Sequence, residues 1–237
     1  MVTMLVTRPE PDASETARRL EALGIAAVIE PLLRAETLPT TLPPAQGFAA
    51  LAVTSANALR ALDDRGAVAP YRHLPLYAVG ERTAACARAL GFATVASADG
   101  AFADLVALIA GAGLAGPVFY PSARQTSGDL PRALAPHGVM VIGAAVYVMH
   151  PAPGFSPGLD LGALDAALFY SRRTAETFAA LAGTAPPHPR LAMLCMSEAV
   201  AGPLLAAHFM RVSLADHPSE DAMLALALSF ARDQNPA

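Results

Sequence analysis

The chain repeats itself, and this internal repeat constrains its fold more than any other feature of the sequence. Four blocks recur in the same order, and the offset between matched residues changes only from 114 to 117: Leu20 with Leu134, Ser55 with Ser171, Val79 with Cys195, and Asp104 with Asp221. A repeat of this length indicates that one supersecondary plan is used twice. We therefore expect an internal duplication that produces two domains of similar architecture.

Within each repeat, short apolar runs alternate with amphipathic segments rich in alanine and leucine. This alternation is typical of parallel sheets with crossover helices, so the expected class is α/β. Strands are predicted at 3–7, 25–30, 48–53, 76–79, 92–96, 117–120, 139–146, 166–170, 191–195 and 211–214. Helices are predicted at 12–23, 57–64, 83–90, 102–110, 128–136, 174–182, 198–208 and 220–232. Ten strands suit two five-stranded sheets better than one open sheet.

Two proline-rich stretches indicate where the domains are joined. "EPLLRAETLPTTLPP" and "HPAPGFSP" each follow the second strand of their repeat. We expect a continuous domain at 38–146 and a discontinuous domain made of 1–34 plus 152–237, with connectors at 35–37 and 147–151. A split into sequential halves near residue 115 is the alternative. Proline placement favours the discontinuous arrangement, because linkers rather than strands carry such residues.

Composition excludes several classes of function. With 54% hydrophobic residues the chain can bury a large core, and a net charge of -4 leaves no electrostatic footprint for nucleic acid. All sixteen basic residues are arginine, which excludes a lysine Schiff base and a Walker-type phosphate loop. The six histidines lack ligand spacing, so no metal is expected. "AVGERTA" has one glycine and is not a dinucleotide fingerprint, so no cofactor is expected either.

The sequence also indicates the cellular location of the protein. "MVTMLVTRPEP" at the N-terminus lacks the basic and long apolar regions of a signal peptide. Apolar runs are interrupted by Gly, Pro or charge before they reach membrane-spanning length. We therefore expect a cytoplasmic protein with no membrane partner.

Candidate functional residues follow the predicted strands, because ligands of parallel α/β sheets bind at the carboxyl ends of the strands. These positions carry mostly small hydroxyls and arginines: Thr7, Arg8, Thr54, Ser55, Gly80 to Thr83, Ser122, Ser171, Arg172, Arg173 and Ser197. The set contains neither a pair of acidic residues nor a histidine with a carboxylate partner. Hydroxyls, backbone N–H groups and guanidiniums suit a polycarboxylate ligand.

Each of these residues also has a purely structural interpretation. Ser55, Ser171 and Ser197 are good helix N-caps, and duplication copies caps as readily as binding residues. Thr83 can simply begin a helix, and Arg172 and Arg173 are typical of a charged surface. Tyr147 ends an apolar run next to a predicted connector, where a tyrosine either packs at a domain edge or projects into a cleft.

Six motifs together resemble the uroporphyrinogen-III synthase family. They are "VTRPEPDASETARRLEALG", "VTSANAL", "AVGERTA", "VYVM", "FYSRRTAETF" and "CMSEAVA", and they span nearly the whole chain in order. The resemblance implies two flavodoxin-like α/β domains, one of them discontinuous, joined by a two-stranded linker with the active site in the cleft between them. It also implies cyclisation of hydroxymethylbilane to uroporphyrinogen III, with loss of water and inversion of ring D through a spiro intermediate. No cofactor is implied; the implied protein is a monomer that receives its small-molecule substrate from hydroxymethylbilane synthase.

The resemblance also assigns roles to individual residues. Tyr147 and Thr83 are the implied catalytic residues, with Tyr147 as the donor to the leaving hydroxyl. The implied substrate-binding residues are Arg8, Thr54, Ser55, Asn57, Gly80, Ser122, Arg124, Ser171 and Ser197. The chain departs from the family pattern at "VFYPSARQTSGDL", where many relatives have a more basic turn with glycine, and after the tyrosine of "VYVMHP". Ser122 and Arg124 are the candidates for the missing contact.

Two other functions fit the residues without the resemblance. The lack of an acid–base pair is compatible with a non-catalytic two-domain module that binds an anionic tetrapyrrole or another polycarboxylate. A nucleotide-binding α/β protein is a third possibility, which the missing glycine fingerprint disfavours.

Overall fold

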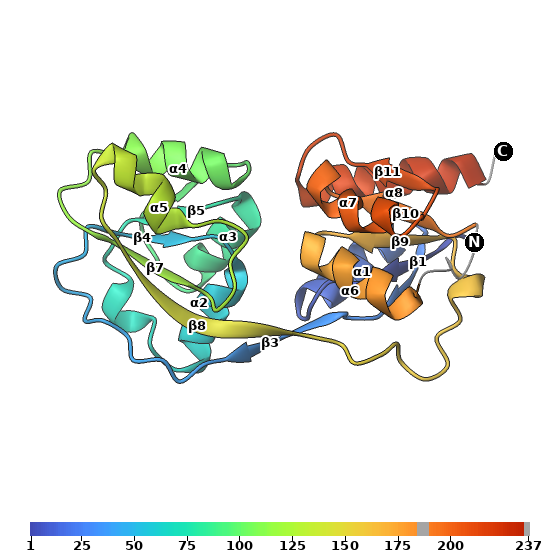
Figure 1. Ribbon diagram of the computed structural model, residues 1–237, viewed down its shortest axis with the longest axis horizontal. Coiled ribbons are helices and arrows are strands. Elements are labelled where there is room, and N and C mark those ends of the chain that lie inside the picture. Colours follow the sequence, from blue (N-terminus) through green and yellow to red (C-terminus); the bar gives the residue numbers. More distant parts are fainter. Residues whose placement is uncertain (184–189, 235–237) are drawn as a thin grey trace. The chain divides into compact units, whose positions relative to one another are not determined.

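The computed structural model describes residues 1–183 and 190–234 and divides into two compact units. One unit consists of Met1–Arg34 with His150–Ala237, and the other of Ala35–Met149. Each unit has its own sheet with helices on both faces (Figure 1). The predicted α/β class is thereby confirmed.

The discontinuous unit contains a five-stranded parallel sheet in the order β11-β10-β9-β1-β2. The strands are β1 (Thr3–Val6), β2 (Ala26–Ile29), β9 (Ala166–Phe169), β10 (Ala192–Cys195) and β11 (Val212–Leu214). Numbered within the unit, this is the 2-1-3-4-5 order of flavodoxin-like folds. Strands β9 and β10 are buried at every position, as their uninterrupted apolar sequences require.

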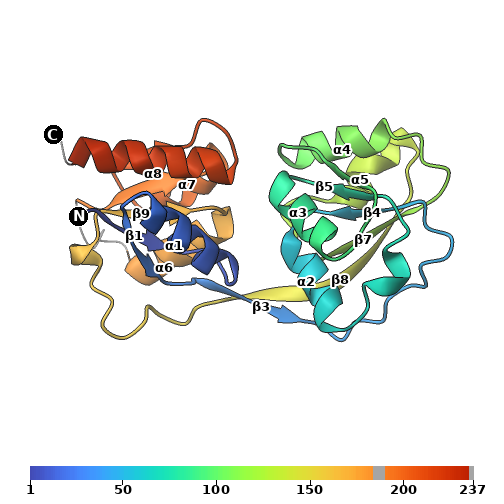
Figure 2. The same cartoon turned by 180° about the vertical axis from the view of Figure 1, so that it is seen from behind.

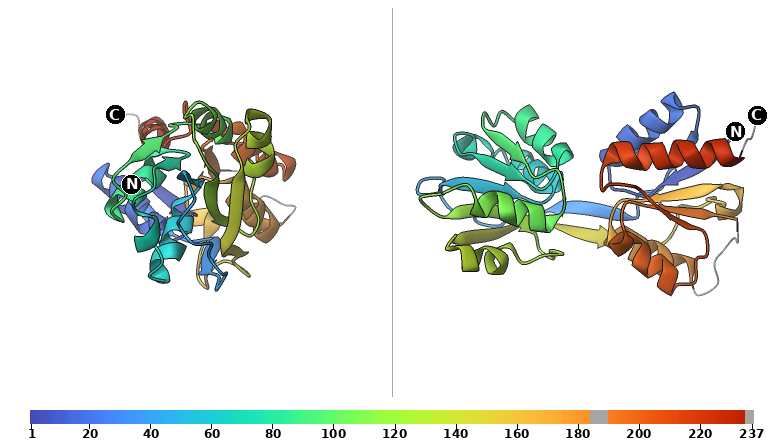
Figure 3. Two further views of the ribbon diagram at one scale, coloured as in Figure 1. Left: turned by 90° about the vertical axis from the view of Figure 1, so that its left-hand side faces the viewer. Right: turned by 90° about the horizontal axis from the view of Figure 1, so that it is seen from above.

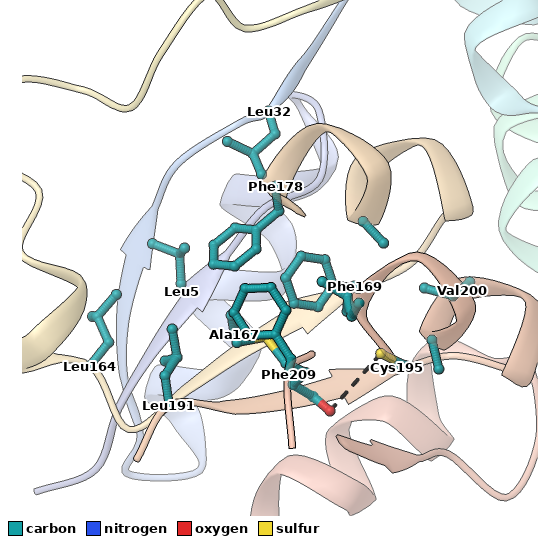
Figure 4. Close-up of a cluster of buried hydrophobic side chains, with 14 residues drawn as sticks. Leu5, Leu32, Leu164, Ala167, Phe169, Phe178, Leu191, Cys195, Val200 and Phe209 are labelled. Atoms are coloured by element: carbon teal, nitrogen blue, oxygen red, sulfur yellow. Dashed lines mark hydrogen bonds between the residues drawn. The ribbon is translucent and has the colours of Figure 1, made fainter. Parts of the chain in front are cut away.

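Helices cover both faces of this sheet (Figures 2 and 3). Helices α1 (Asp12–Ala22) and α8 (Glu220–Gln234) pack on one face, with Met4 and Val6 beneath them. Helices α6 (Arg172–Ala182) and α7 (Glu198–Ala206) pack on the other, and a short 3-10 turn, η3, spans Leu161–Ala163. There Phe178 lies with its ring centroid 5.1 Å from that of Phe169 and 5.7 Å from that of Phe209 (Figure 4). This aromatic cluster anchors α6 and so places the turn after β9.

The continuous unit contains a six-stranded sheet in the order β3-β8-β7-β4-β5-β6. The strands are β3 (Leu33–Thr37), β4 (Ala50–Val53), β5 (Leu76–Ala78), β6 (Val95–Ser97), β7 (Val118–Ala123) and β8 (Val141–Pro151). If β7 and β8 are matched to β1 and β2, as in the sequence repeat, the last five strands have the same 2-1-3-4-5 order as the other sheet. This shared order accords with an internal duplication, which stays a prediction.

Four helices and two 3-10 turns complete the continuous unit. Helices α2 (Ala56–Asp64) and α3 (Glu81–Ala89) pack together, with η1 (Ala69–Tyr71) between them in the chain. Helices α4 (Phe102–Ala110) and α5 (Leu130–Leu134), with η2 (Ala135–His137), share a core with Ala50, Ala52, Val118 and Tyr120. Alternate strand residues point to opposite faces, so Leu51, Val53 and Phe119 point away from α4 and α5.

Strands β3 and β8 differ from the prediction. No strand was predicted at 33–37, and the predicted strand 139–146 ends five residues before β8 does. Leu38 N donates to Val146 O at 2.8 Å and Ala152 N donates to Leu32 O at 2.9 Å, so the two segments run antiparallel to each other. Both predicted connectors are thus extended and paired, as the two-stranded linker implied by the family resemblance requires. Their pairing partner is more than 100 residues away in the chain, and no local pattern reveals it.

Candidate functional site

The carboxyl edge of each sheet carries the predicted site residues. In the discontinuous unit the strand order reverses between β1 and β9, and in the continuous unit it reverses between β7 and β4. Such switch points are where ligands bind in open α/β sheets, because the helices that follow the two strands leave on opposite faces. Thr7 and Ser171 flank the first switch point, and Thr54 and Arg124 flank the second.

Arg8, which the resemblance assigns to substrate binding, lies in a buried ion-pair cluster. Its side chain is buried, with the residue 8% exposed, and its guanidinium forms an ion pair with Glu220 of α8. It also donates to Thr16 Oγ1 at 3.2 Å and lies 3.4 Å from Asp12 Oδ2. Two carboxylates of its own unit therefore already face Arg8. The sequence could not show this, because Glu220 is 212 residues away.

Tyr170 completes this buried cluster. The Arg8 guanidinium lies 4.1 Å from the centroid of the Tyr170 ring, a cation–π geometry, and the Tyr170 hydroxyl donates to Glu220 Oε1 at 3.3 Å. Burial, and then the charge of Glu220, raises the pKa of Tyr170. The cluster joins β1, α1, β9 and α8, so we interpret it as a structural anchor of the C-terminal helix.

The three serines at helix starts fall into two groups. Ser55 Oγ accepts a hydrogen bond from Asn57 N at 3.2 Å and caps α2, and Ser171 Oγ accepts from Thr174 N at 3.2 Å and caps α6. Ser197 precedes α7 but its side chain forms no cap bond. Ser55 and Ser171 are therefore caps whatever else they do, whereas the hydroxyl of Ser197 is not used in this way.

Thr54 lies at the switch point of the continuous unit. Its Oγ1 is 3.1 Å from the hydroxyl oxygen of Tyr120, which belongs to the neighbouring strand β7. Tyr120 is 4% exposed, and burial raises the pKa of its phenol, which therefore stays protonated. Sequence reasoning missed Tyr120, although a tyrosine two residues before a strand-end serine on an apolar strand is a usable signal.

The remaining edge residues of the continuous unit lie at the ends of β7 and β5. Ser122 is buried and its hydroxyl donates to Ala123 O at 3.1 Å, while the exposed Arg124 donates its backbone N–H to Tyr147 O at 2.8 Å. Gly80 precedes α3, and a Cβ there would meet nothing within 4 Å, so space is open above this helix start. Thr83 is buried in the first turn of α3, where its N–H donates to Gly80 O at 3.1 Å.

Tyr147 lies inside β8, at the start of the paired stretch that is predicted as a connector. Strand β8 continues through Tyr147 to Pro151, and the side chain is buried, with the residue 6% exposed. Ser122 pairs with Ala145 and Ala123 pairs with Tyr147, so β8 accommodates one extra residue at a β-bulge. This irregularity interrupts the strand immediately before Tyr147.

The bulge changes the face to which Tyr147 points. Paired residues of neighbouring strands share a face, while consecutive residues such as Ser122 and Ala123 point to opposite faces. Ala145 and Tyr147 therefore point to opposite faces, although a regular strand would place them on the same one. Tyr147 thus points away from α4 and α5, to the face that also bears Met149.

Helix α2 reaches this face of β8 through the side chain of Asn57. Asn57 Nδ2 lies 4.0 Å from Met149 Sδ, and Met149 is two residues beyond Tyr147 on the same face. The structure thus brings Tyr147, Asn57 and the capped turn at Ser55 to one face of one sheet. Among the residues that the structure describes, no three His, Cys, Asp or Glu side chains could together hold a metal ion.

These features define a class: a two-unit flavodoxin-like α/β protein with hydroxyl-bearing turns at the switch point of each sheet. The family model of uroporphyrinogen-III synthase HemD matches residues 14–225, and the chain belongs to this family. As a member of it, the protein is an enzyme of tetrapyrrole biosynthesis. Over the described residues, none of the helices is both long and apolar enough to cross a membrane.

Solved structures agree with the family assignment at the level of the fold. The chain is similar to the uroporphyrinogen-III synthetase of Helicobacter pylori 26695, with a TM-score of 0.66 and 21% identity over 97% of this chain and 99% of that one. It is also similar to a mutant uroporphyrinogen III synthase of Thermus thermophilus, with a TM-score of 0.57 and 16% identity over 98% of this chain and 100% of that one. A search of curated proteins found no match.

Proposed function

We propose that the protein is a cyclising lyase that converts hydroxymethylbilane into uroporphyrinogen III, with loss of water and inversion of ring D through a spiro intermediate. The observation that carries the proposal is the family match over residues 14–225. The chemistry of the edge residues supports it, since hydroxyls and backbone N–H groups suit a flexible octacarboxylate that must be folded into one shape. The proposed enzyme acts as a monomer on substrate supplied by hydroxymethylbilane synthase.

In the proposed mechanism Tyr147 assists departure of water. Its phenol donates a proton to the terminal hydroxyl of the bilane, the carbon–oxygen bond breaks, and water leaves an azafulvene cation. Ring D attacks this cation through its substituted carbon and forms the spiro intermediate. The spiro intermediate then fragments, and the macrocycle closes with ring D inverted. The pyrrole proton lost in the last step balances the one donated by Tyr147, so no external reactant is consumed.

The other strand-end residues are proposed to bind the carboxylates of the substrate. Carboxylates are held in the continuous unit by the strand-end residues Thr54, Ser55, Asn57, Gly80, Ser122 and Arg124. Ser171 and Ser197 hold them in the other unit, whereas Arg8 takes no part because it is paired with Glu220. Donors of this kind suit carboxylates, which only accept hydrogen bonds when ionised. Thr83, in the first turn of α3, is the second proposed catalytic residue.

The test is an isomer assay. The purified protein is added to freshly generated hydroxymethylbilane, and the products are oxidised and resolved into type I and type III uroporphyrin. Type III product is expected, and type I alone, as from spontaneous closure, would overturn the proposal. Saturable binding of uroporphyrin III without type III formation would identify a non-catalytic binding module instead.

A further inference from the structure

A hydrogen bond inside α2 fixes the orientation of one proposed substrate-binding side chain. Arg60 Nη1 donates to Asn57 Oδ1 at 2.8 Å. The two residues are three positions apart, which places them on the same side of the helix, and both are half-buried. Arg60 itself is not a strand-end residue, and no motif of the sequence singles it out.

The chemistry of the pair leaves only one arrangement of the amide. A guanidinium has donors and no acceptor, so it must face the carbonyl oxygen of Asn57 and not its NH2 group. Without this partner the amide could turn by 180° and exchange the two atoms, which have nearly the same shape. The charge-assisted bond therefore sets the direction of the NH2 group.

That NH2 group points toward the face of β8 that carries Tyr147. Asn57 Nδ2 lies 4.0 Å from Met149 Sδ, and Met149 shares its face with Tyr147 because two residues separate them along the strand. The group has two N–H donors, and a thioether sulfur is only a weak acceptor. Better acceptors at this place would be carboxylate oxygens.

We infer that Arg60 is a positioning residue, which holds the Asn57 amide so that its N–H donors face the Tyr147 side of β8 and bind a carboxylate of the substrate. The identity of the substrate rests on the proposed function, while the orientation of the amide does not. Arg60 acts through Asn57, so its loss should weaken substrate binding much more than turnover.

The test is a double-mutant cycle of Asn57→Ala and Arg60→Met. For each variant kcat, KM and the isomer ratio are measured, and binding of uroporphyrin III, the oxidised octacarboxylate product, is followed by its fluorescence. Each single variant is expected to raise KM and the Kd of uroporphyrin III about tenfold, with kcat changed less than about twofold. The double variant should be no worse than Asn57→Ala alone, because Arg60 has then nothing left to orient.

Two further variants separate positioning from a structural role. Arg60→Lys keeps a donor for Asn57 Oδ1 and should regain most of the lost affinity. Arg18→Met removes an arginine whose side chain is 69% exposed in the other unit, and should leave both constants unchanged. Thermal melting of all variants shows whether they are folded. If Arg60→Met does not fold, Arg60→Lys and Asn57→Ala still measure how the Arg60–Asn57 bond affects KM and the Kd of uroporphyrin III.

The outcomes distinguish this inference from the proposed function. Type III product with additive losses in the cycle, or with unchanged KM in Arg60→Met, would overturn the inference alone. Type I product only, with coupled losses of uroporphyrin III affinity, would overturn the proposed function and support the inference. A protein that neither forms type III product nor binds uroporphyrin III would overturn both.

Discussion

Thr54 Oγ1 lies 3.1 Å from the hydroxyl oxygen of Tyr120, and this contact joins the first residue beyond β4 to the neighbouring strand β7. The two strands flank the point at which the strand order of the sheet reverses. Because Tyr120 is buried and protonated, its hydroxyl holds the start of the turn that leads through Ser55 into α2. The turn that presents the proposed binding residues is thus anchored in the core.

Replacing Tyr120 by phenylalanine should destabilise the continuous unit by about 1 kcal/mol, because the half-buried Thr54 hydroxyl loses its partner. Denaturant unfolding of the two variants Tyr120→Phe and Thr54→Val, alone and combined, measures this energy. The combined loss should be smaller than the sum. Tyr77→Phe, on strand β5, serves as the control for removal of a phenol hydroxyl from the same sheet, and equal losses at both tyrosines would contradict the assignment.

Breaking the ion pair between Arg8 and Glu220 should destabilise the protein strongly. Glu220→Gln removes one of the two carboxylates that face the buried guanidinium, so a loss of roughly 3 kcal/mol is expected in urea unfolding. Arg19→Met is the matched control, because its partner Asp221 has an 85% exposed side chain and such pairs contribute less than about 1 kcal/mol. Similar losses in the two variants would show that Arg8 is not an anchor.

The helix-start serines should separate into caps and non-caps. Ser55→Ala and Ser171→Ala each remove a cap bond and should cost about 1 kcal/mol of stability. Ser197→Ala removes no such bond and should change stability by less than about 0.5 kcal/mol. Any rise in KM for Ser197→Ala would then report loss of a substrate contact. A large fall in the melting temperature of Ser197→Ala would contradict this division.

Tyr147→Phe tests the proposed proton donor directly. The variant keeps the ring in its buried position on β8 and removes only the hydroxyl, so KM should change little. The rate of type III formation should fall about 100-fold, a common loss when a general acid is removed. Single-turnover measurements of product isomers check this expectation, and undiminished turnover would remove the phenol from the mechanism.

Stability should fall at alkaline pH because of Cys195. Complete burial in β10 raises the pKa of its thiol from 9.0 to about 12. The folded state therefore keeps a proton that the unfolded chain releases above pH 9, and the resulting stability is complete below pH 9 and is lost as the pH rises toward 12. The slope for one proton is about 1.4 kcal/mol per pH unit.

Urea unfolding of the wild type and of Cys195→Ala between about pH 8 and about pH 11 measures this slope. The alanine variant should lose stability less steeply, by about one proton. Parallel curves for the wild type and Cys195→Ala would contradict the predicted linkage. Burial raises the pKa of Tyr170 as well, so this residue also releases its proton on unfolding and adds to the absolute slope. The difference between variants is therefore compared.

Predictions from the sequence succeeded where the deciding interactions are between neighbours along the chain. Alternating apolar runs and amphipathic segments revealed the α/β class, and a serine before "ANAL" or "RRTA" revealed the caps of α2 and α6. The local pattern missed β3 and the end of β8, because two weakly patterned segments become strands only by pairing with each other. Only the family resemblance implied a two-stranded linker there. The pairing adds hydrogen bonds that neither segment could form alone.

Residue types and their spacing along the chain are enough to define the repeat, the order of the elements other than β3, and the hydroxyl-rich turns. Which side chains meet at those turns depends on how the elements pack. Glu220 pairs with Arg8 because α8 packs beside α1, and Tyr147 points away from α4 and α5 because β8 holds one extra residue opposite β7. A register shift of one residue reverses the face of every side chain that follows it, and only the paired strands contain that information.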